Sequence, residues 1–366
     1  MKLAYMSKDN TTAIKGIALI MMFIHHFFTC SGFYVESVSY PFLESIAIFA
    51  VQPFRMCVPV FAFLTGYFYY FSVHKNLGYS IRKITNIYLN YWIVFIPFFV
   101  FALATGCFQF VVTDVIMEFF ALRRAVMVFC WYVIFYALTM LMLPILTRIG
   151  KSPIGEVIFL FLVPTVVCSA FLSVFENRRI SEIIENVMIW FPCVASGYLC
   201  SKYTLFSKLD SITQEFNNRF ASIAFCVVLI IGSFIGRFFG ATVTIGNFHM
   251  FGCDAVFTYS LDIVCAPLFV YGWAKLLNRC QKTRFIKILM AIGKKSLLMW
   301  FLHGIFFNCC KEITQPFLFL PKDPLLVLIF GLALCYVVAI PLDWMLGYVQ
   351  KWLYRTKTSP STAEIG

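Results

Sequence analysis

Runs of about twenty apolar residues, separated by short polar or basic segments, recur along nearly the whole chain. A run of this length, folded as a helix, is long enough to cross the hydrocarbon core of a bilayer. The pattern predicts an all-α, polytopic membrane bundle of about ten transmembrane helices. The predicted spans are 12–31, 54–73, 87–106, 126–146, 155–175, 183–201, 219–239, 255–275, 296–313 and 325–347.

Composition supports this assignment and leaves little room for a soluble domain. Of the 366 residues 61% are hydrophobic and 13% are charged, and the mean hydropathy is +0.86. A soluble domain of this size could not bury so much apolar surface. We predict one membrane domain, residues 1–354, and a disordered cytoplasmic tail, residues 355–366, which reads "RTKTSPSTAEIG".

The net charge of +12 has a topological explanation, because basic residues gather in alternate loops. With a cytoplasmic N-terminus, only eight of the 29 basic residues fall on the outer side. These eight are Arg55, Arg123, Arg124, Arg178, Arg179, Arg237, Lys311 and Lys322. Basic loops face the cytoplasm, so both termini are predicted to lie there. The scatter of charge among short loops argues against nucleic-acid binding.

Candidate chemistry begins in the first span, "IKGIALIMMFIHHFFTC", from Ile14 to Cys30. Ionisable residues inside a span are costly and are functional candidates by default. Lys15 and His26 are eleven positions apart, so they share a helix face about 16 Å apart along the axis. His25 points about 80° to one side. An anionic ligand could place its charge by Lys15 and its reactive end by His26, since histidine is suited to proton transfer near neutral pH.

The same histidines have a simpler interpretation, namely core imidazoles bonded to neighbouring carbonyls. The other polar stretches likewise have a structural and a functional interpretation. Arg82 and Lys83 in "SIRKITNIYLNYW" are either a basic and aromatic membrane anchor or a clamp for phosphate. "RMCVPVFAFLTGYFYY" has a proline and a glycine within a span, "CWYVIFYALTMLMLP" opens one with Trp131, and "GKKSLLMWFLHGIFF" places His303 at membrane depth.

Together these five stretches, in this order, resemble the acyltransferase-3 family over roughly residues 10–310. Its members are integral-membrane enzymes, typically of ten spans, that O-acylate bacterial carbohydrates. In that family an arginine stands eleven residues before an essential histidine, and the matching positions here are Lys15 and His26. The family's basic motif matches Arg82 and Lys83. The chain departs from the family pattern at Lys15, which lacks the two-pronged guanidinium, and at Asn86 and Tyr136, where many members have an arginine and an acidic residue.

The resemblance implies an acyl-CoA-dependent O-acyltransferase, most simply an O-acetyltransferase, of a bacterial plasma membrane. It implies a sugar hydroxyl of a surface or secreted polysaccharide, or of its lipid-linked precursor, as acceptor. His26 would be the general base or a transient acyl carrier, assisted by His25, and Lys15, Arg82 and Lys83 would hold the donor. Supporting or acceptor-side candidates are Arg55, Thr65, Tyr88, Trp131, Tyr132 and His303. We expect no metal and no tightly bound cofactor.

Two other functions compete with this one. Buried histidines together with Asp262 and Asp343 would also suit a proton-coupled transporter of a small polar solute. A sensor or assembly factor without chemistry would leave the histidines purely structural. A serine-hydrolase mechanism is disfavoured because the chain lacks a G-x-S-x-G elbow.

Overall fold

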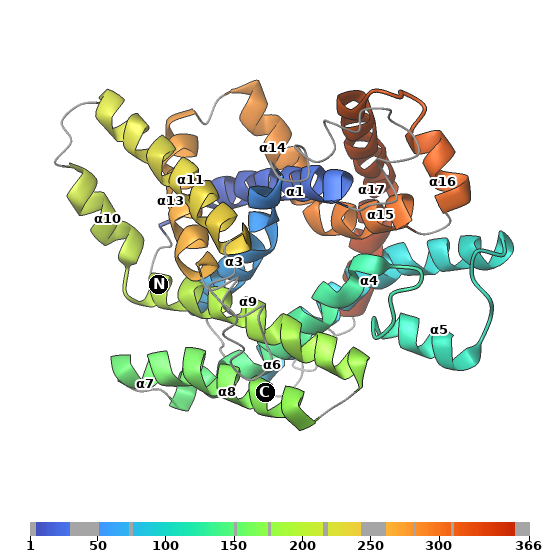
Figure 1. Ribbon diagram of the computed structural model, residues 1–366, viewed down its shortest axis with the longest axis horizontal. Coiled ribbons are helices and arrows are strands. Elements are labelled where there is room, and N and C mark those ends of the chain that lie inside the picture. Colours follow the sequence, from blue (N-terminus) through green and yellow to red (C-terminus); the bar gives the residue numbers. More distant parts are fainter. Residues whose placement is uncertain are drawn as a thin grey trace, which may run out of the picture.

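The computed structural model describes residues 5–29, 51–72, 76–149, 152–174, 177–214, 219–242, 261–280, 283–308 and 311–355. Within these ranges the chain is helical and contains no strand, as predicted. The predicted tail beyond Arg355 lies outside them. Figure 1 shows the helices crossing one another at varied angles rather than forming one parallel bundle.

The helices of the first half of the chain are α1 (Lys8–Thr29), η1 (Gln52–Met56), α3 (Cys57–Phe71), α4 (Leu77–Ala104), α5 (Val112–Phe119), η2 (Val128–Cys130) and α6 (Trp131–Ile149). Those that follow are α7 (Pro153–Val157), the π-helical η3 (Ile158–Leu162), α8 (Val163–Val174), α9 (Arg178–Lys202), α10 (Leu205–Gln214) and α11 (Arg219–Thr242). The last are α13 (Asp262–Cys280), α14 (Arg284–Lys294), α15 (Ser296–Asn308), α16 (Lys311–Leu318) and α17 (Pro324–Arg355).

In the described residues each of the ten predicted spans overlaps a helix, and 54–73, 126–146, 155–175 and 296–313 overlap more than one. Seven helical stretches in the described residues are long and apolar enough to cross a membrane. The helix α3 has 15 residues and α15 has 13, so both are short for a span. The helix α13 carries charge and begins at Asp262. The first residues of the span predicted there, 255–260, lie outside the described residues. The number of spans and their orientation stay predictions.

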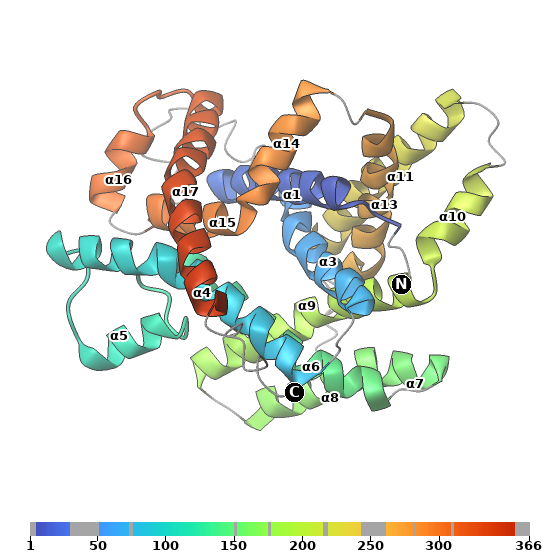
Figure 2. The ribbon, with the colours of Figure 1, turned by 180° about the vertical axis from the view of Figure 1, so that it is seen from behind.

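The first helix lies inside the assembly, whereas α7 and α8 lie at its margin (Figures 1 and 2). In α1, 67% of the apolar window is buried by protein, against 17% in the stretch Pro153–Val174. An apolar helix at the margin can face lipid, but one in the interior must satisfy its polar groups through protein partners. The polar residues of α1 are therefore expected to find partners on other helices.

Two helix pairs approach at backbone contact distance through glycine. A methyl group on Gly66 of α3 would collide with the carbonyl of Val194 in α9, and one on Gly197 of α9 would collide with the carbonyl of Phe63. The same reciprocal arrangement joins α1 to α14 through Gly16 and Gly293. Small residues of this kind let membrane helices pack closely where no hydrophobic effect drives them together. These contacts fix α1, which carries Lys15, His25 and His26, and α3, which carries Thr65.

Replacing Gly197 with alanine tests this packing. Overpacking of this kind typically costs about 1–3 kcal/mol, so we expect Gly197→Ala to lower the unfolding temperature of the purified protein. The matched control is Gly232→Ala in α11, where no described atom lies within 4 Å of an added methyl. That change should be neutral or slightly stabilising, because alanine favours helix more than glycine does. Equal melting temperatures for the two variants would contradict the close approach.

Candidate active site

The site is built around a hydrogen bond between two histidines that are far apart in sequence. His26 Nδ1 in α1 lies 2.8 Å from His303 Nε2 in α15. The two rings are nearly coplanar, with an interplanar angle of 4°. His303 is fully buried. An imidazole pair joined edge to edge in this way is a defined arrangement and not a loose contact.

The partners of His303 determine which nitrogen of His26 is available. His303 Nδ1 contacts the carbonyl oxygen of Trp300, which can only accept, so Nδ1 carries the proton. In the neutral ring Nε2 of His303 is then an acceptor, and His26 must donate to it from Nδ1. His26 is left with an unprotonated Nε2. Neutral and so oriented, His26 presents a lone pair to whatever occupies the adjacent cavity.

An aromatic ring covers both imidazoles. The Phe129 ring lies parallel to His26, with centroids 4.1 Å apart, and parallel to His303, with centroids 4.6 Å apart. The backbone carbonyl of Phe129 also accepts a hydrogen bond of 3.3 Å from the Trp300 indole. Phe129 thus restrains the plane of the histidine pair from one side and ties the α5–α6 loop to α15.

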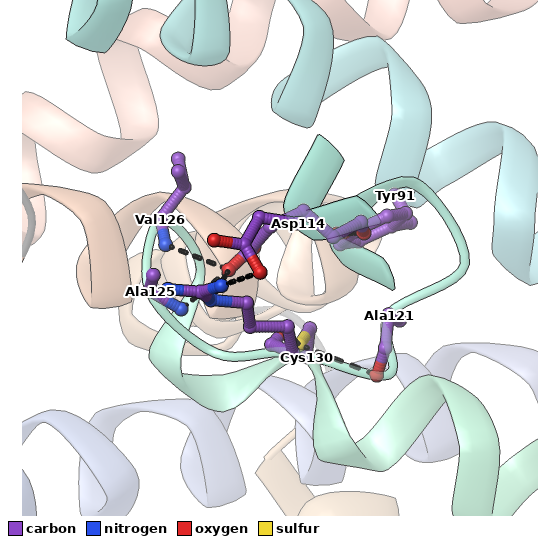
Figure 3. Close-up of polar contacts among 8 residues, drawn as sticks. Tyr91, Asp114, Ala121, Ala125, Val126 and Cys130 are labelled. Atoms are coloured by element: carbon purple, nitrogen blue, oxygen red, sulfur yellow. Dashed lines mark hydrogen bonds and ion pairs between the residues drawn. The ribbon is translucent and has the colours of Figure 1, made fainter. Parts of the chain in front are cut away.

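The loop that carries Phe129 is held by a buried carboxylate. Glu118 is fully buried, and its Oε1 accepts hydrogen bonds from the backbone N–H groups of Ala125 and Val126. Figure 3 shows this part of the loop, together with Cys130, whose thiol lies 3.7 Å from the carbonyl of Ala121. Burial raises the pKa of the Glu118 carboxyl, while the backbone N–H groups oppose that rise. The carboxylate therefore orders a segment that has no regular secondary structure of its own.

His26 lines a cavity of about 250 Å³, which we call the histidine cavity. Its polar lining comes from His25, His26, Arg55 and Asn186. The remaining lining residues are Cys57, Val58, Phe129, Trp131, Ile189 and Trp190. His25 Nδ1 lies 3.4 Å from the carbonyl of Val51, so the neighbour bonded to His26 is His303 rather than His25. The catalytic roles predicted for His26 and His25 stay predictions.

A larger cavity of about 660 Å³, the inner cavity, lies along the N-terminal half of α1. Lys15 and Lys83 both line it, as do Thr65, Tyr132 and Trp300. A further cavity is lined by Arg82, Lys83, Asn86 and Gln350, so Lys83 and Asn86 belong to both. The structure thus brings the three predicted donor cations, Lys15, Arg82 and Lys83, to one region.

Aromatic side chains separate the inner cavity from the histidine cavity. Tyr132 and Trp300 line the inner cavity, whereas Phe129 and Trp131 line the histidine cavity. The Tyr132 and Trp300 rings are 4.8 Å apart, and the Trp131 and Trp300 rings 6.5 Å. We call these four residues the aromatic partition. No described residue lines both cavities.

Three other predicted residues have partners that do not belong to the histidine pair. The Tyr88 hydroxyl donates to the carbonyl of Phe120, 3.1 Å away, and so anchors the α5–α6 loop. Asp262 forms a buried ion pair with Arg237, 3.0 Å apart, between α13 and α11. Asp343 pairs with Lys295 at 2.6 Å. Both carboxylates thus have cationic partners within the bundle.

Sequence reasoning did not select Phe129, Glu118, Asn186 or Gln350. Glu118 had a usable signal, because it is an acidic residue in the otherwise apolar run "VIMEFF". Gln350 donates a 2.6 Å hydrogen bond to Asn86 from α17, and no local pattern marks that pairing. No group of three metal-ligating side chains occurs in the described part of the chain.

A multi-pass membrane protein with an oriented, neutral histidine that lines a cavity within the helices is the class that fold and site define. Its sequence matches the model of the acyltransferase domain of the acyltransferase-3 family over residues 10–344. The chain belongs to this family, and the resemblance noted from its motifs is confirmed. No curated protein and no solved structure gave a significant match. The protein is therefore a membrane acyltransferase.

The hydrogen bond between the histidines can be tested with His303→Ala. Without its acceptor, the His26 Nδ1–H is unsatisfied and the favoured tautomer is lost, so we expect acyl transfer to fall by at least about 10²-fold. His303→Gln offers an oxygen acceptor and should retain more activity than His303→Ala at every pH. The measurement is the rate of acyl transfer against pH for correctly inserted variants with similar melting temperatures. An unchanged rate in His303→Ala would show that His26 needs no orienting partner.

Proposed function

We propose that this protein transfers an acyl group, acetyl in the simplest case, from acyl-CoA to a sugar hydroxyl. The acceptor would be a surface or secreted polysaccharide or its lipid-linked precursor, and the location the plasma membrane of a bacterium. The observation that carries the proposal is the orientation of His26, whose Nδ1 is occupied by His303. The unprotonated Nε2 is then the base or nucleophile that such a transfer requires.

The cations around the inner cavity support acyl-CoA as the donor. Lys15 and Lys83 line a space of about 660 Å³, and Arg82 lies in the cavity that shares Lys83 with it. Ammonium and guanidinium groups bind phosphate through charge-assisted hydrogen bonds. A CoA thioester bound by its phosphates at these residues would direct its acyl end along α1 toward His26, about 16 Å further along the axis.

The reaction can proceed by either of two routes. In the first, His26 Nε2 removes the proton of the sugar hydroxyl while the hydroxyl oxygen attacks the thioester carbonyl. The C–O bond forms, the C–S bond breaks, and the proton passes to the departing sulfur. In the second, Nε2 itself attacks the carbonyl, CoA leaves as a thiol, and the sugar hydroxyl takes the acyl group from the imidazole. His303 stabilises the positive charge that His26 acquires in both routes, by accepting from Nδ1.

Negative charge develops on the carbonyl oxygen of the thioester in both routes, and Arg55 is placed to stabilise it. Arg55 lines the histidine cavity together with His26. A preorganised donor at such a position typically contributes about 10²–10³-fold in rate. The aromatic partition would have to admit the thioester, and ring rotation at Trp131 or Trp300 is the smallest motion that achieves this.

The transporter alternative receives less support from the described contacts. Asp262 is neutralised by Arg237 and lines none of the cavities described above. A buried carboxylate with a fixed cationic partner is a structural element in most cases, since an unpaired charge there would be costly.

Labelled acetyl-CoA tests the proposal directly. Wild-type protein in native membranes should transfer label to glycan or retain it on protein, and His26→Ala should do neither. Retention of label on wild-type protein that a sugar acceptor then discharges would select the acyl-carrier route. The control is Lys287→Ala, at an exposed residue of α14 outside the cavities, and His25→Ala shows how much the neighbouring imidazole contributes while the His26–His303 bond stays in place. Normal transfer by a correctly inserted His26→Ala variant would refute the proposal.

The donor site has a separate prediction. Lys15→Ala and Lys83→Ala should each raise the KM for acyl-CoA by about 10-fold, the effect of losing about 1.4 kcal/mol of binding free energy. The matched control is Lys287→Ala in α14, an exposed lysine outside the cavities described. Initial rates at varied donor concentration measure the effect. If all three variants share the wild-type KM, the donor binds elsewhere.

A further inference from the structure

A fourth cavity, of about 340 Å³, is lined by four arginines and one carboxylate. Arg123 and Arg124 come from the α5–α6 loop, and Arg178 and Arg179 from the first turn of α9. The other lining residues are Ala121, Leu122, Trp131, Ile134, Phe135, Glu182, Ile183 and Asn186. We call it the arginine cavity.

The arginine cavity adjoins the histidine cavity. Trp131 and Asn186 line both spaces, so their side chains form a common wall. The inner cavity shares no described lining residue with the arginine cavity. A ligand in the arginine cavity could thus reach the histidine cavity without passing through the inner cavity.

Positive charge is only partly compensated there. Arg124 pairs with Glu182 at 2.9 Å, and Arg178 lies 3.3 Å from the same carboxylate. Arg123 pairs with Asp114 and lies 4.0 Å from Glu118. Arg179 has no carboxylate within ion-pair distance among the described residues.

The use of arginine rather than lysine also indicates the kind of ligand. On the predicted outer side, where basic residues are few, all six between residues 51 and 242 are arginine and none is lysine. Four of them line the arginine cavity, and Arg55 lines the histidine cavity. Arginine binds carboxylate and phosphate through two parallel hydrogen bonds, whereas lysine acts as a point charge. The aromatic rings of Trp131 and Phe135 add an apolar wall of the kind that ligand sites use.

We propose that the arginine cavity binds the acceptor, and that this acceptor is an anionic sugar bearing a carboxylate or a phosphate. This inference rests on the proposed function, since it names the substrate class for the same reaction. The guanidinium groups bind the anion, the sugar ring packs against Trp131, and the hydroxyl to be acylated extends past Asn186 toward His26.

The test is equilibrium binding to the purified protein in phosphatidylcholine nanodiscs. The probes are trigalacturonate and its trimethyl ester, which has a similar shape without the charge, and galactose 1-phosphate against galactose. At least one anionic probe should bind about 10-fold more tightly than its neutral counterpart, or tighter still, and added salt should weaken its binding. Comparison of the galacturonate pair with the galactose pair shows whether the cavity prefers a carboxylate or a phosphate.

Variants assign the effect to this cavity. Arg179→Gln should remove the preference for the anionic probe, Arg179→Lys should keep part of it, and Arg284→Gln, an exposed arginine in α14, should leave it intact. Equal binding of the charged and neutral probes, or binding of none, would overturn the inference. Displacement of the anionic probes by phosphatidylglycerol would also overturn it, because the cavity would then be a site for lipid headgroups.

Donor binding and His26-dependent labelling are measured on the same samples. If acetyl-CoA still binds through Lys15 and Lys83 while the anionic sugars fail, the inference about the acceptor is wrong and the proposed function stands. If donor binding and labelling also fail, the proposed function itself is wrong.

Discussion

The hydrogen bond between His26 and His303 is the interaction on which the rest of the site depends. In a membrane protein an imidazole in the interior is tolerated when it is neutral and its polar atoms have partners. Two neutral imidazoles offer two donors and two acceptors. The chain from the Trp300 carbonyl through His303 to His26 uses both donors and one acceptor. The one atom not used is Nε2 of His26, so the bonding that makes the pair tolerable also determines where chemistry can occur.

The same requirement explains why irregular backbone lies beside the site. The α5–α6 loop brings Phe129 over both rings, and its N–H groups need acceptors because no helix or strand satisfies them. Glu118 provides two of these acceptor bonds. Tyr88 donates to the carbonyl of Phe120 at the start of the loop, and Tyr91 donates to the carbonyl of Glu118 in the last turn of α5. The desolvation that this buried carboxylate costs is offset by the order it gives to the loop.

The helices could be predicted from sequence because each depends on a local run of apolar residues. Boundaries were less accurate where hydropathy does not distinguish conformations, as at the 3₁₀ turn Gln52–Met56 before α3. Lys15 and His26 could be related because one helix fixes their separation. His303 was identified as a polar residue at membrane depth, but its bond to His26 joins residues 277 positions apart. Helix packing, which local patterns do not encode, sets that contact and the placement of Phe129.

On the proposed function, the arrangement of cavities addresses a difficulty common to acyl transfer between two aqueous compartments. A thioester in contact with water and a general base would be hydrolysed, so the base has to be shielded until the acceptor is bound. The aromatic partition lies between the inner cavity and the histidine cavity, and Trp131 belongs also to the wall of the arginine cavity. A ligand that packs against Trp131 would alter the position of a ring in the partition. Acceptor binding and access of the donor to His26 would then be coupled through one side chain.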